Sequence, residues 1–223
     1  MASGLVPDVH PLFELRAARV AAGGRPLGWK VGFGSEAAQA RLGIATPLLG
    51  FLMEEGRLED GATCSVAGWK NPLLEPEFGV LLARDVADAS DLEGAIAGLA
   101  PAIELVDIFP PPEDPDLILA GNVFHRRVLI GDVDRSRRNA AGISAHILRD
   151  GVEVAATPEP EALNGTIAAN VGFVADALAA AGERLRAGDV VIAGSITPPQ
   201  PVAAGERWVV ELPPLGAISV AFA

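Results

Sequence analysis

Glycine and proline constrain the fold of this chain more than any other feature of its sequence. The 223 residues include 25 glycines and 18 prolines, which occur along the whole chain. Both residues favour turns, and proline also interrupts helices and central strands. Their abundance predicts many turns joining short strands, and it argues against a helical bundle. The length allows a sizeable core, so we expect a single domain over residues 1–223 with an N-terminal helical segment at 1–26.

Charge, hydropathy and cysteine content narrow the class of protein. The net charge of −12 makes the chain a poor general binder of nucleic acid or of anionic membranes. Its mean hydropathy is +0.33, but no apolar run reaches the roughly 18 residues of a membrane span. The start MASGLVPDVH lacks the features of a secretory signal. A single cysteine, Cys64, cannot form an internal disulfide or supply a zinc site built on several cysteines. We therefore expect a cytoplasmic protein.

Hydrophobic periodicity and turn residues predict an α+β chain with more sheet than helix. Helices are expected at residues 11–22, 35–43 (with Ser35 as N-cap) and 160–182 (beginning at Pro160), with one or two helical turns at 91–99. Strands are expected at residues 27–34, 62–67, 73–83, 101–109, 143–149, 152–156 and 190–194, and in a closing hairpin of 207–212 and 217–222. Loops are expected at residues 110–116 and in the basic tract 125–138. The strands are too irregularly spaced for a repeated βαβ unit.

The stretch LLEPEFGVLL, residues 73–82, places two glutamates in an apolar run. Successive side chains of a strand point to opposite faces, so Glu75 and Glu77 share one face, roughly 7 Å apart. Two carboxylates at this separation repel each other unless water screens them or a cation lies between them. The pair is therefore either part of a solvated strand face or part of a site for Mg²⁺, Mn²⁺ or Ca²⁺.

The stretch LGWKVGFG, residues 27–34, places one lysine among glycines. In a strand, Lys30 shares its face only with glycines, which lets a ligand approach the backbone closely. One alternative is a lysine that protects an exposed sheet edge from aggregation. Another is a dinucleotide site, because GFGSEA (32–37) fits the G-x-G-x-x-A pattern and Glu54 and Glu55 follow about twenty residues later.

A third stretch, PAIELVDIF at residues 101–109, carries two acids in apolar company. Glu104 and Asp107 point to opposite faces of the expected strand. Each carboxylate should be paired, metal-bound or exposed. The local pattern does not decide which of the two belongs to a site.

Taken in order, these stretches resemble the fumarylacetoacetate hydrolase superfamily, and within it the 2-keto-4-pentenoate hydratase branch. The resemblance covers roughly residues 12–222 and rests on GWKVGFGSEAAQARLGI, PLLGFL, LLEPEFGVLL, PAIELVDIF and VVIAGSITPPQPVAAGERWVVELPPLGAISVAF. It implies a mixed β-roll of the fumarylacetoacetase C-terminal type. It also implies a Mg²⁺ or Mn²⁺ site formed by Glu75, Glu77 and Glu104, which favours Glu104 over Asp107. Asp107 would then be a second group that orients a metal ligand.

The resemblance further implies how a substrate is held. Family members act on 2-oxo acids or their enols, and the metal stabilises enolate charge as a Lewis acid. Lys30 matches a lysine that faces the metal and would bind the developing oxyanion. Gly194 and Ser195 match a strand-end turn beside the substrate, and Asn122 matches the asparagine of a D-N-A-S-S run. Because the family forms oligomers, we expect a homo-oligomer that binds a small 2-oxo acid.

Two departures from the branch bear on the reaction. The branch has an acid in a P-D-F-G segment, where this chain has Leu48. The small hydroxyl residues after Asn122 are also missing, and His125 stands nearby. Histidine titrates near neutral pH, so His125 is the candidate catalytic base or acid.

Three functions remain open from the sequence. The first is a metal-dependent hydratase or lyase. The second is C–C cleavage, either acylpyruvate hydrolysis or decarboxylation of the oxaloacetate type. The third is a weakly active metal-binding partner subunit, which the loss of the acid at Leu48 favours.

Overall fold

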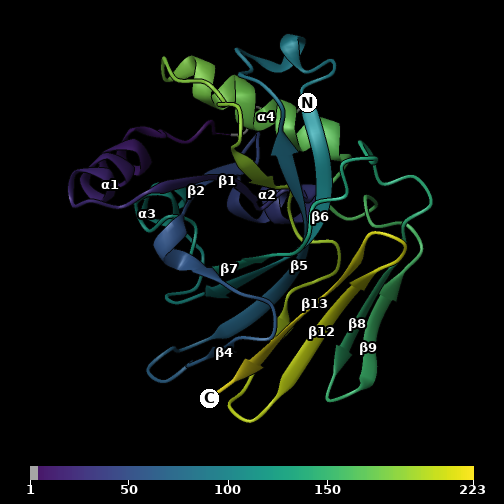
Figure 1. Cartoon of the computed structure of the whole chain (residues 1–223). Helices are drawn as coiled ribbons and strands as arrows, with labels where there is room; N and C mark the ends of the chain where they lie inside the picture. Colours follow the sequence, from purple (N-terminus) through teal and green to yellow (C-terminus); the bar gives the residue numbers. More distant parts are fainter. Residues whose placement is uncertain (1–4) are drawn as a thin grey trace.

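The computed structural model describes residues 5–223 and contains two β-sheets (Figure 1). The larger sheet contains β1 (Pro26–Gly32), β2 (Leu48–Met53), β3 (Arg57–Leu58), β5 (Pro72–Leu82), β6 (Ile96–Asp107), β7 (His125–Ile130), β10 (Val190–Ile192) and β11 (Gln200–Pro201). Its order is β2-β1-β10-β5-β6-β7-β3, and β11 pairs with β5. The smaller sheet contains β4 (Thr63–Cys64), β8 (Ala145–Arg149), β9 (Val152–Thr157), β12 (Arg207–Leu212) and β13 (Gly216–Phe222), in the order β4-β13-β12-β8-β9.

Both sheets share one hydrophobic core. The smaller sheet packs on the larger one through contacts of β12 and β13 with β6. The core cluster includes Val80 of the larger sheet and Ile147 of the smaller sheet, both fully buried. Most strand pairs are antiparallel, while β1 with β10, β3 with β7 and β13 with β4 are parallel. The expected α+β architecture with a curled mixed sheet is confirmed.

Helices cover the larger sheet at separate places. They are α1 (His10–Ala21), α2 (Glu36–Leu42), α3 (Pro115–Ala120) and α4 (Ile167–Ala180), with 3₁₀ turns η1 (Glu54–Gly56) and η2 (Ala89–Asp91). In Figure 1, α1 and α3 lie together on one side, and α4 runs across the top. Within residues 5–223, no helix combines the length and the apolar character needed to cross a membrane.

The first two expected helices form where the sequence predicts them. The α1 helix begins one residue before the predicted start and is followed by Gly23, which has a positive φ. Ser35 caps α2 as expected, because its hydroxyl accepts a hydrogen bond from the Ala38 N–H at 3.3 Å.

The predicted start of the long helix is wrong. The α4 helix begins at Ile167 rather than at Pro160. Gly165 has a φ of +82°, and Asn-Gly is a turn-forming pair. The side chain of Thr166 then caps the helix by accepting a hydrogen bond from the Ala169 N–H at 3.1 Å.

Three further expectations also need correction. Residues 125–130 form β7, inside the larger sheet, rather than a solvated loop. Residues 96–107 form the long strand β6, so only η2 remains of the helical turns expected at 91–99. Nearly every residue of β6 is buried, because the strand is covered on both faces. A strand of this kind does not show the alternation of apolar and polar residues by which a half-buried strand is recognised. The α3 helix begins at Pro115, inside the expected loop 110–116.

Candidate active site

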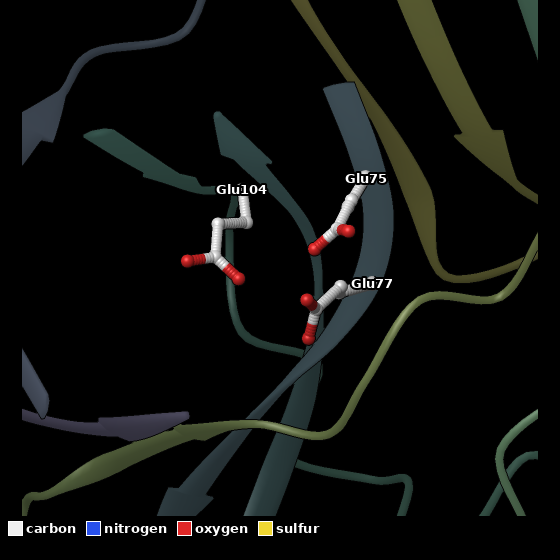
Figure 2. A group of neighbouring side chains, drawn as sticks. All are labelled: Glu75, Glu77 and Glu104. Carbon is white, nitrogen blue, oxygen red and sulfur yellow. The ribbon is translucent and has the colours of Figure 1, made fainter. Parts of the chain in front are cut away.

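Three glutamates meet where β5 pairs with β6. The antiparallel register places Glu75 directly opposite Glu104, and Glu77 follows on the same face of β5. Each carboxylate offers an oxygen, and these oxygens all lie within 4.8 Å of one another. Figure 2 shows the three carboxylates turned into the same space. Glu77 and Glu104 are completely buried. The pairing of two strands thus brings together the three residues predicted as metal ligands, and the burial of two of them excludes a solvated strand face.

The donor set fits a divalent cation. Glu77 Oε1 and Glu104 Oε2 are buried and have no hydrogen-bond partner within residues 5–223. Burying a carboxylate oxygen without a partner is costly unless a cation or a donor satisfies it. Carboxylate oxygens are the ligands that Mg²⁺ and Mn²⁺ prefer in proteins. The cluster therefore supports a divalent metal between β5 and β6.

The electrostatics of the cluster differ from one carboxyl group to the next. Loss of solvation raises the pKa of Glu75 to about 7, and the charge of Glu104 adds to the effect. Burial also raises the pKa of Glu77 well above its usual value, with further contributions from both neighbours. Burial would raise the pKa of Glu104 as well, but Lys30 and His125 outweigh it and hold this pKa below its usual value. Without further positive charge, the three groups therefore resist full ionisation.

Lys30 supplies positive charge from a neighbouring strand. Its side chain is only 1% exposed, and Nζ donates hydrogen bonds to Glu104 Oε1 at 2.5 Å and to the Val123 carbonyl at 3.0 Å. An ammonium group has three donor hydrogens, so one remains for a ligand. The edge-strand explanation of this lysine is wrong, because β1 lies between β2 and β10 inside the sheet.

A glycine across the strand pair makes room for this lysine. Gly50 pairs with Lys30 in the β1–β2 register. A Cβ atom at Gly50 would lie 2.6 Å from Lys30 Cγ and 2.8 Å from Cδ, closer than real carbon atoms approach. The local sequence pattern gives no sign of this role of Gly50, because the contact follows from strand pairing.

The alternative of a dinucleotide site also fails at this strand. The G-x-G-x-x-A match does lie between β1 and α2. However, the next strand, β2, pairs with β1 antiparallel, whereas the dinucleotide-binding βαβ unit needs parallel strands.

A cavity of about 500 Å³ opens beside the cluster. Its lining includes Lys30 and Glu75 together with the apolar side chains of Phe33 and Phe124. Arg41 of α2 also lines it and is exposed to solvent. Because its lining includes both a fully buried lysine and a solvent-exposed arginine, the cavity connects the carboxylate cluster with the surface.

The strand-end turn after β10 forms another part of the cavity wall. The Gly194 N–H donates a hydrogen bond to Glu77 Oε2 at 2.7 Å, which fixes one oxygen of that carboxylate. Ser195 lines the cavity, and its hydroxyl donates to the Thr197 carbonyl at 2.6 Å. Gly194 therefore contacts a predicted metal ligand, whereas Ser195 borders the cavity.

Asn164 is a cavity residue that sequence analysis missed. Its amide donates to the Ser195 carbonyl at 2.5 Å. Asn170 of α4 supports this turn, because its amide donates to the carbonyls of Asn164 and Ala193. The available signal was the Asn164-Gly165 pair, which marks a turn but not what the turn contacts.

Comparisons with known proteins agree with this geometry, although no family model matches the chain. The chain is 29% identical to 2-hydroxyhexa-2,4-dienoate hydratase of Comamonas testosteroni, over 96% of this chain and 84% of that protein. It is 30% identical to the TodF product hydratase of Pseudomonas putida, over 91% of this chain and 78% of that protein. The chain belongs to the fumarylacetoacetate hydrolase superfamily, in its hydratase branch.

A solved structure of the same superfamily confirms the fold. The 4-oxalocrotonate decarboxylase of Pseudomonas putida G7, complexed with magnesium and adipate, superposes with a TM-score of 0.88 at 26% identity. The alignment covers 95% of this chain and 83% of that one. The chain is thus a hydratase-like enzyme of this superfamily, with decarboxylases among its relatives.

His125, predicted as a catalytic base, lies behind Glu104 rather than in the cavity lined by Lys30 and Glu75. It begins β7, its side chain is 9% exposed, and Nδ1 lies 2.7 Å from Glu104 Oε1. His125 lines a different cavity, of about 580 Å³, which also contains Arg19. Because an ionised carboxylate only accepts hydrogen bonds, Nδ1 carries the hydrogen in this contact. This position suits a residue that orients Glu104 better than one that transfers a proton to a substrate.

Two other residues singled out from the superfamily pattern also lie outside the cavity lined by Lys30 and Glu75. Both amide atoms of Asn122, predicted to bind substrate, are used by the backbone of Phe51, at 2.8 Å and 2.9 Å. Leu48, which replaces the acid of the branch, is 1% exposed and lines an apolar cavity beside α4.

Asp107 is separate from the carboxylate cluster. Its carboxylate accepts hydrogen bonds from the N–H groups of Lys70 and Asn71, and it pairs with Arg126 at 3.2 Å. These contacts outweigh the effect of burial and lower the pKa of Asp107. None of these contacts involves a predicted metal ligand. They therefore give no support to the expectation that Asp107 orients a metal ligand.

Proposed function

We propose that this enzyme adds water to a small 2-oxo acid or its enol, with Mg²⁺ or Mn²⁺ held by Glu75, Glu77 and Glu104. One observation carries the proposal. Three carboxylates converge within 4.8 Å beside a lysine and a cavity, and two of their buried oxygens lack a hydrogen-bond partner among the described residues. When bound, the ion supplies a Lewis acid for the carboxylate and 2-oxo oxygens of the substrate.

The side chains of the chain have complementary roles in this proposal. Lys30 donates its third ammonium hydrogen to the substrate oxygen that gains negative charge, which stabilises the enolate. Glu104 and the Val123 carbonyl hold that ammonium group in place through the two hydrogen bonds already described. Gly194 keeps Glu77 oriented, and the apolar side chains of Phe33 and Phe124 limit the access of bulk water.

Decarboxylation is a second candidate, and the cavity lining favours it specifically. The ionisable residues that line the substrate cavity in the described chain are Lys30, Arg41 and Glu75. Glu75 is needed as a metal ligand, so no separate histidine or acid remains there to activate water. Loss of CO₂ from a β-keto acid needs charge stabilisation but no activated water. A weakly active metal-binding subunit is the third possibility and also follows from the absence of that acid.

A substrate panel distinguishes the three functions. The purified protein is incubated with a 2-hydroxydienoate, an acylpyruvate and oxaloacetate, each with Mg²⁺, with Mn²⁺ and with EDTA. A hydratase consumes the dienoate and forms a hydroxylated 2-oxo acid only with metal, whereas a decarboxylase releases CO₂. Tight metal binding without turnover of any substrate would identify a partner subunit and contradict the first two functions.

The remaining expectations belong to the same proposal. We expect one domain, which the shared core of both sheets supports, and a homo-oligomer, which light scattering tests. We also propose a cytoplasmic location, in keeping with the single cysteine. Calorimetric titration with Mg²⁺ and Mn²⁺ determines which ion the site prefers.

A further inference from the structure

The substrate cavity contains a second cation whose environment differs from that of Lys30. Lys30 is buried and paired with Glu104. Arg41 lies in the last turn of α2, is exposed, and lines the same cavity. Its guanidinium makes no hydrogen bond or ion pair with any residue in 5–223. Residues 1–4 are Met-Ala-Ser-Gly and contain no acidic side chain that could pair with it.

The lining of this cavity is mainly apolar. It includes Phe33, Phe124, Ile108 and Leu163. A ligand that fills the cavity therefore contacts charged groups at the buried carboxylate cluster, the apolar side chains of the lining, and the exposed guanidinium of Arg41, which has no ion pair with the described residues.

We propose that Arg41 is a specificity-determining residue that binds a second, distal carboxylate of the substrate. The inference rests on the proposed function, and it narrows the substrate class to 2-oxo acids that carry an anionic group at the far end of an apolar chain. A guanidinium group matches a carboxylate in a bidentate arrangement, which a neutral chain end cannot form.

The simpler explanation of Arg41 is helix stabilisation, because cations near a helix C-terminus interact favourably with the helix dipole. The chain provides a matched control for that effect. Arg19 also lies in the last turn of a helix and is exposed, but it lines the cavity behind Glu104 rather than the substrate cavity. Arg19→Gln and Arg41→Gln therefore remove the same charge from equivalent helix positions.

The test measures ligand binding by calorimetry in the presence of Mg²⁺. The ligands are pyruvate and two length series: 2-oxoglutarate, 2-oxoadipate and 2-oxopimelate, and the corresponding 2-oxo monoacids without the distal carboxylate. We expect at least one diacid to bind the parent protein about tenfold more tightly than its monoacid partner, as one charge-assisted pair allows. Arg41→Gln should remove this preference without changing pyruvate affinity, and Arg19→Gln should retain it.

The outcomes separate this inference from the proposed function. If no diacid is preferred, or if the preference survives in Arg41→Gln, the role of Arg41 is wrong while the 2-oxo acid site stands. If neither pyruvate nor any 2-oxo acid binds with Mg²⁺, the proposed function is wrong and the inference fails with it. Equal loss of preference in Arg19→Gln and Arg41→Gln would indicate general electrostatics and would also contradict the inference.

Discussion

Lys30 Nζ lies 2.5 Å from Glu104 Oε1, and both side chains are almost completely buried. Such a pair in isolation contributes little to stability, because desolvation offsets the attraction. Here Glu104 has a second oxygen without a partner in residues 5–223, and two further carboxylates lie beside it. One lysine cannot neutralise three carboxylates, so the pair makes chemical sense as part of a larger site that includes a divalent cation.

The first prediction concerns the metal. Glu77→Ala should abolish Mg²⁺ binding, because it removes one of three ligands. The fold should remain, because the change also removes a buried carboxyl group whose pKa is strongly raised. Calorimetric titration measures the affinity, and thermal unfolding in EDTA measures the stability. Glu211→Ala is the control, since Glu211 is an exposed strand carboxylate far from the cluster in the sequence. Unchanged Mg²⁺ affinity in Glu77→Ala would rule out the assignment.

The second prediction concerns Lys30. Lys30→Met should retain Mg²⁺ binding but weaken pyruvate binding by roughly 10- to 100-fold, as expected for the loss of a charge-assisted hydrogen bond worth about 1.5–3 kcal/mol. Calorimetry with Mg²⁺ first and pyruvate second separates the two effects. Pyruvate binding equal to that of the parent would show that the ammonium group does not contact the substrate.

The third prediction concerns Gly50, whose missing side chain leaves space for Lys30. Gly50→Ala should destabilise the protein by about 1–3 kcal/mol, as overpacking of a core does, and should also weaken pyruvate binding. Gly56→Ala is the control, because a Cβ there meets its nearest atom only at 3.6 Å. Chemical denaturation and calorimetry measure the two effects. If both variants behave alike, Lys30 can shift freely, and Gly50 is not needed to position it.

The alternation of strand residues explains how much of this site could be predicted from the sequence. Lys30 and the Glu75–Glu77 pair lie on the predicted faces, because a period of two determines which way each side chain points. Glu104 could not be chosen over Asp107 in this way, because β6 is buried on both faces. Only its register with β5 places Glu104 opposite Glu75, and such pairing between distant segments leaves no local pattern.

Long-range contacts also explain the parts of the fold that were missed. The start of β7 carries His125 and two arginines, which resemble a solvated loop until β6 is available as a partner. The same holds for Asn164, whose role depends on a carbonyl 31 residues away in the sequence. The sequence predicted a helix across Asn164 and Gly165, and although Asn-Gly marks a turn, only tertiary structure decides what that turn contacts.

The fourth prediction is a pH dependence that follows from Glu75. Its pKa is raised to about 7 in the folded protein, above its usual value of 4.5. The folded state therefore binds more protons than the unfolded state between these values, and metal-free stability should fall as pH rises from about 4.5 through 7. Mg²⁺ must displace those protons, so its affinity should rise over the same interval. Thermal unfolding in EDTA and in Mg²⁺ at pH 5.5 and 8 measures both trends.

A matched variant tests whether Glu75 causes these trends. Glu75→Gln keeps the shape of the side chain but cannot titrate. It should weaken Mg²⁺ binding and flatten the fall of metal-free stability with pH. If the slope in EDTA is the same in Glu75→Gln and in the parent protein, general charge repulsion explains the trend instead.

The last prediction distinguishes two roles for His125. Its Nδ1 contacts Glu104 Oε1 at 2.7 Å, while its ring lines the cavity that contains Arg19 and not the one that contains Lys30 and Glu75. A residue that orients a metal ligand typically changes affinity or activity by about 10- to 100-fold when it is removed. His125→Ala should therefore reduce activity by about that factor. In His125→Asn the amide nitrogen lies close to the position of Nδ1, so it can donate to Glu104 and should restore most of the activity.

A direct proton donor or acceptor could not be replaced by an amide, which does not titrate. If both variants lose activity while their Mg²⁺ affinity is unchanged, His125 acts as the catalytic base that the sequence suggested. The positioning role that the geometry supports would then be wrong.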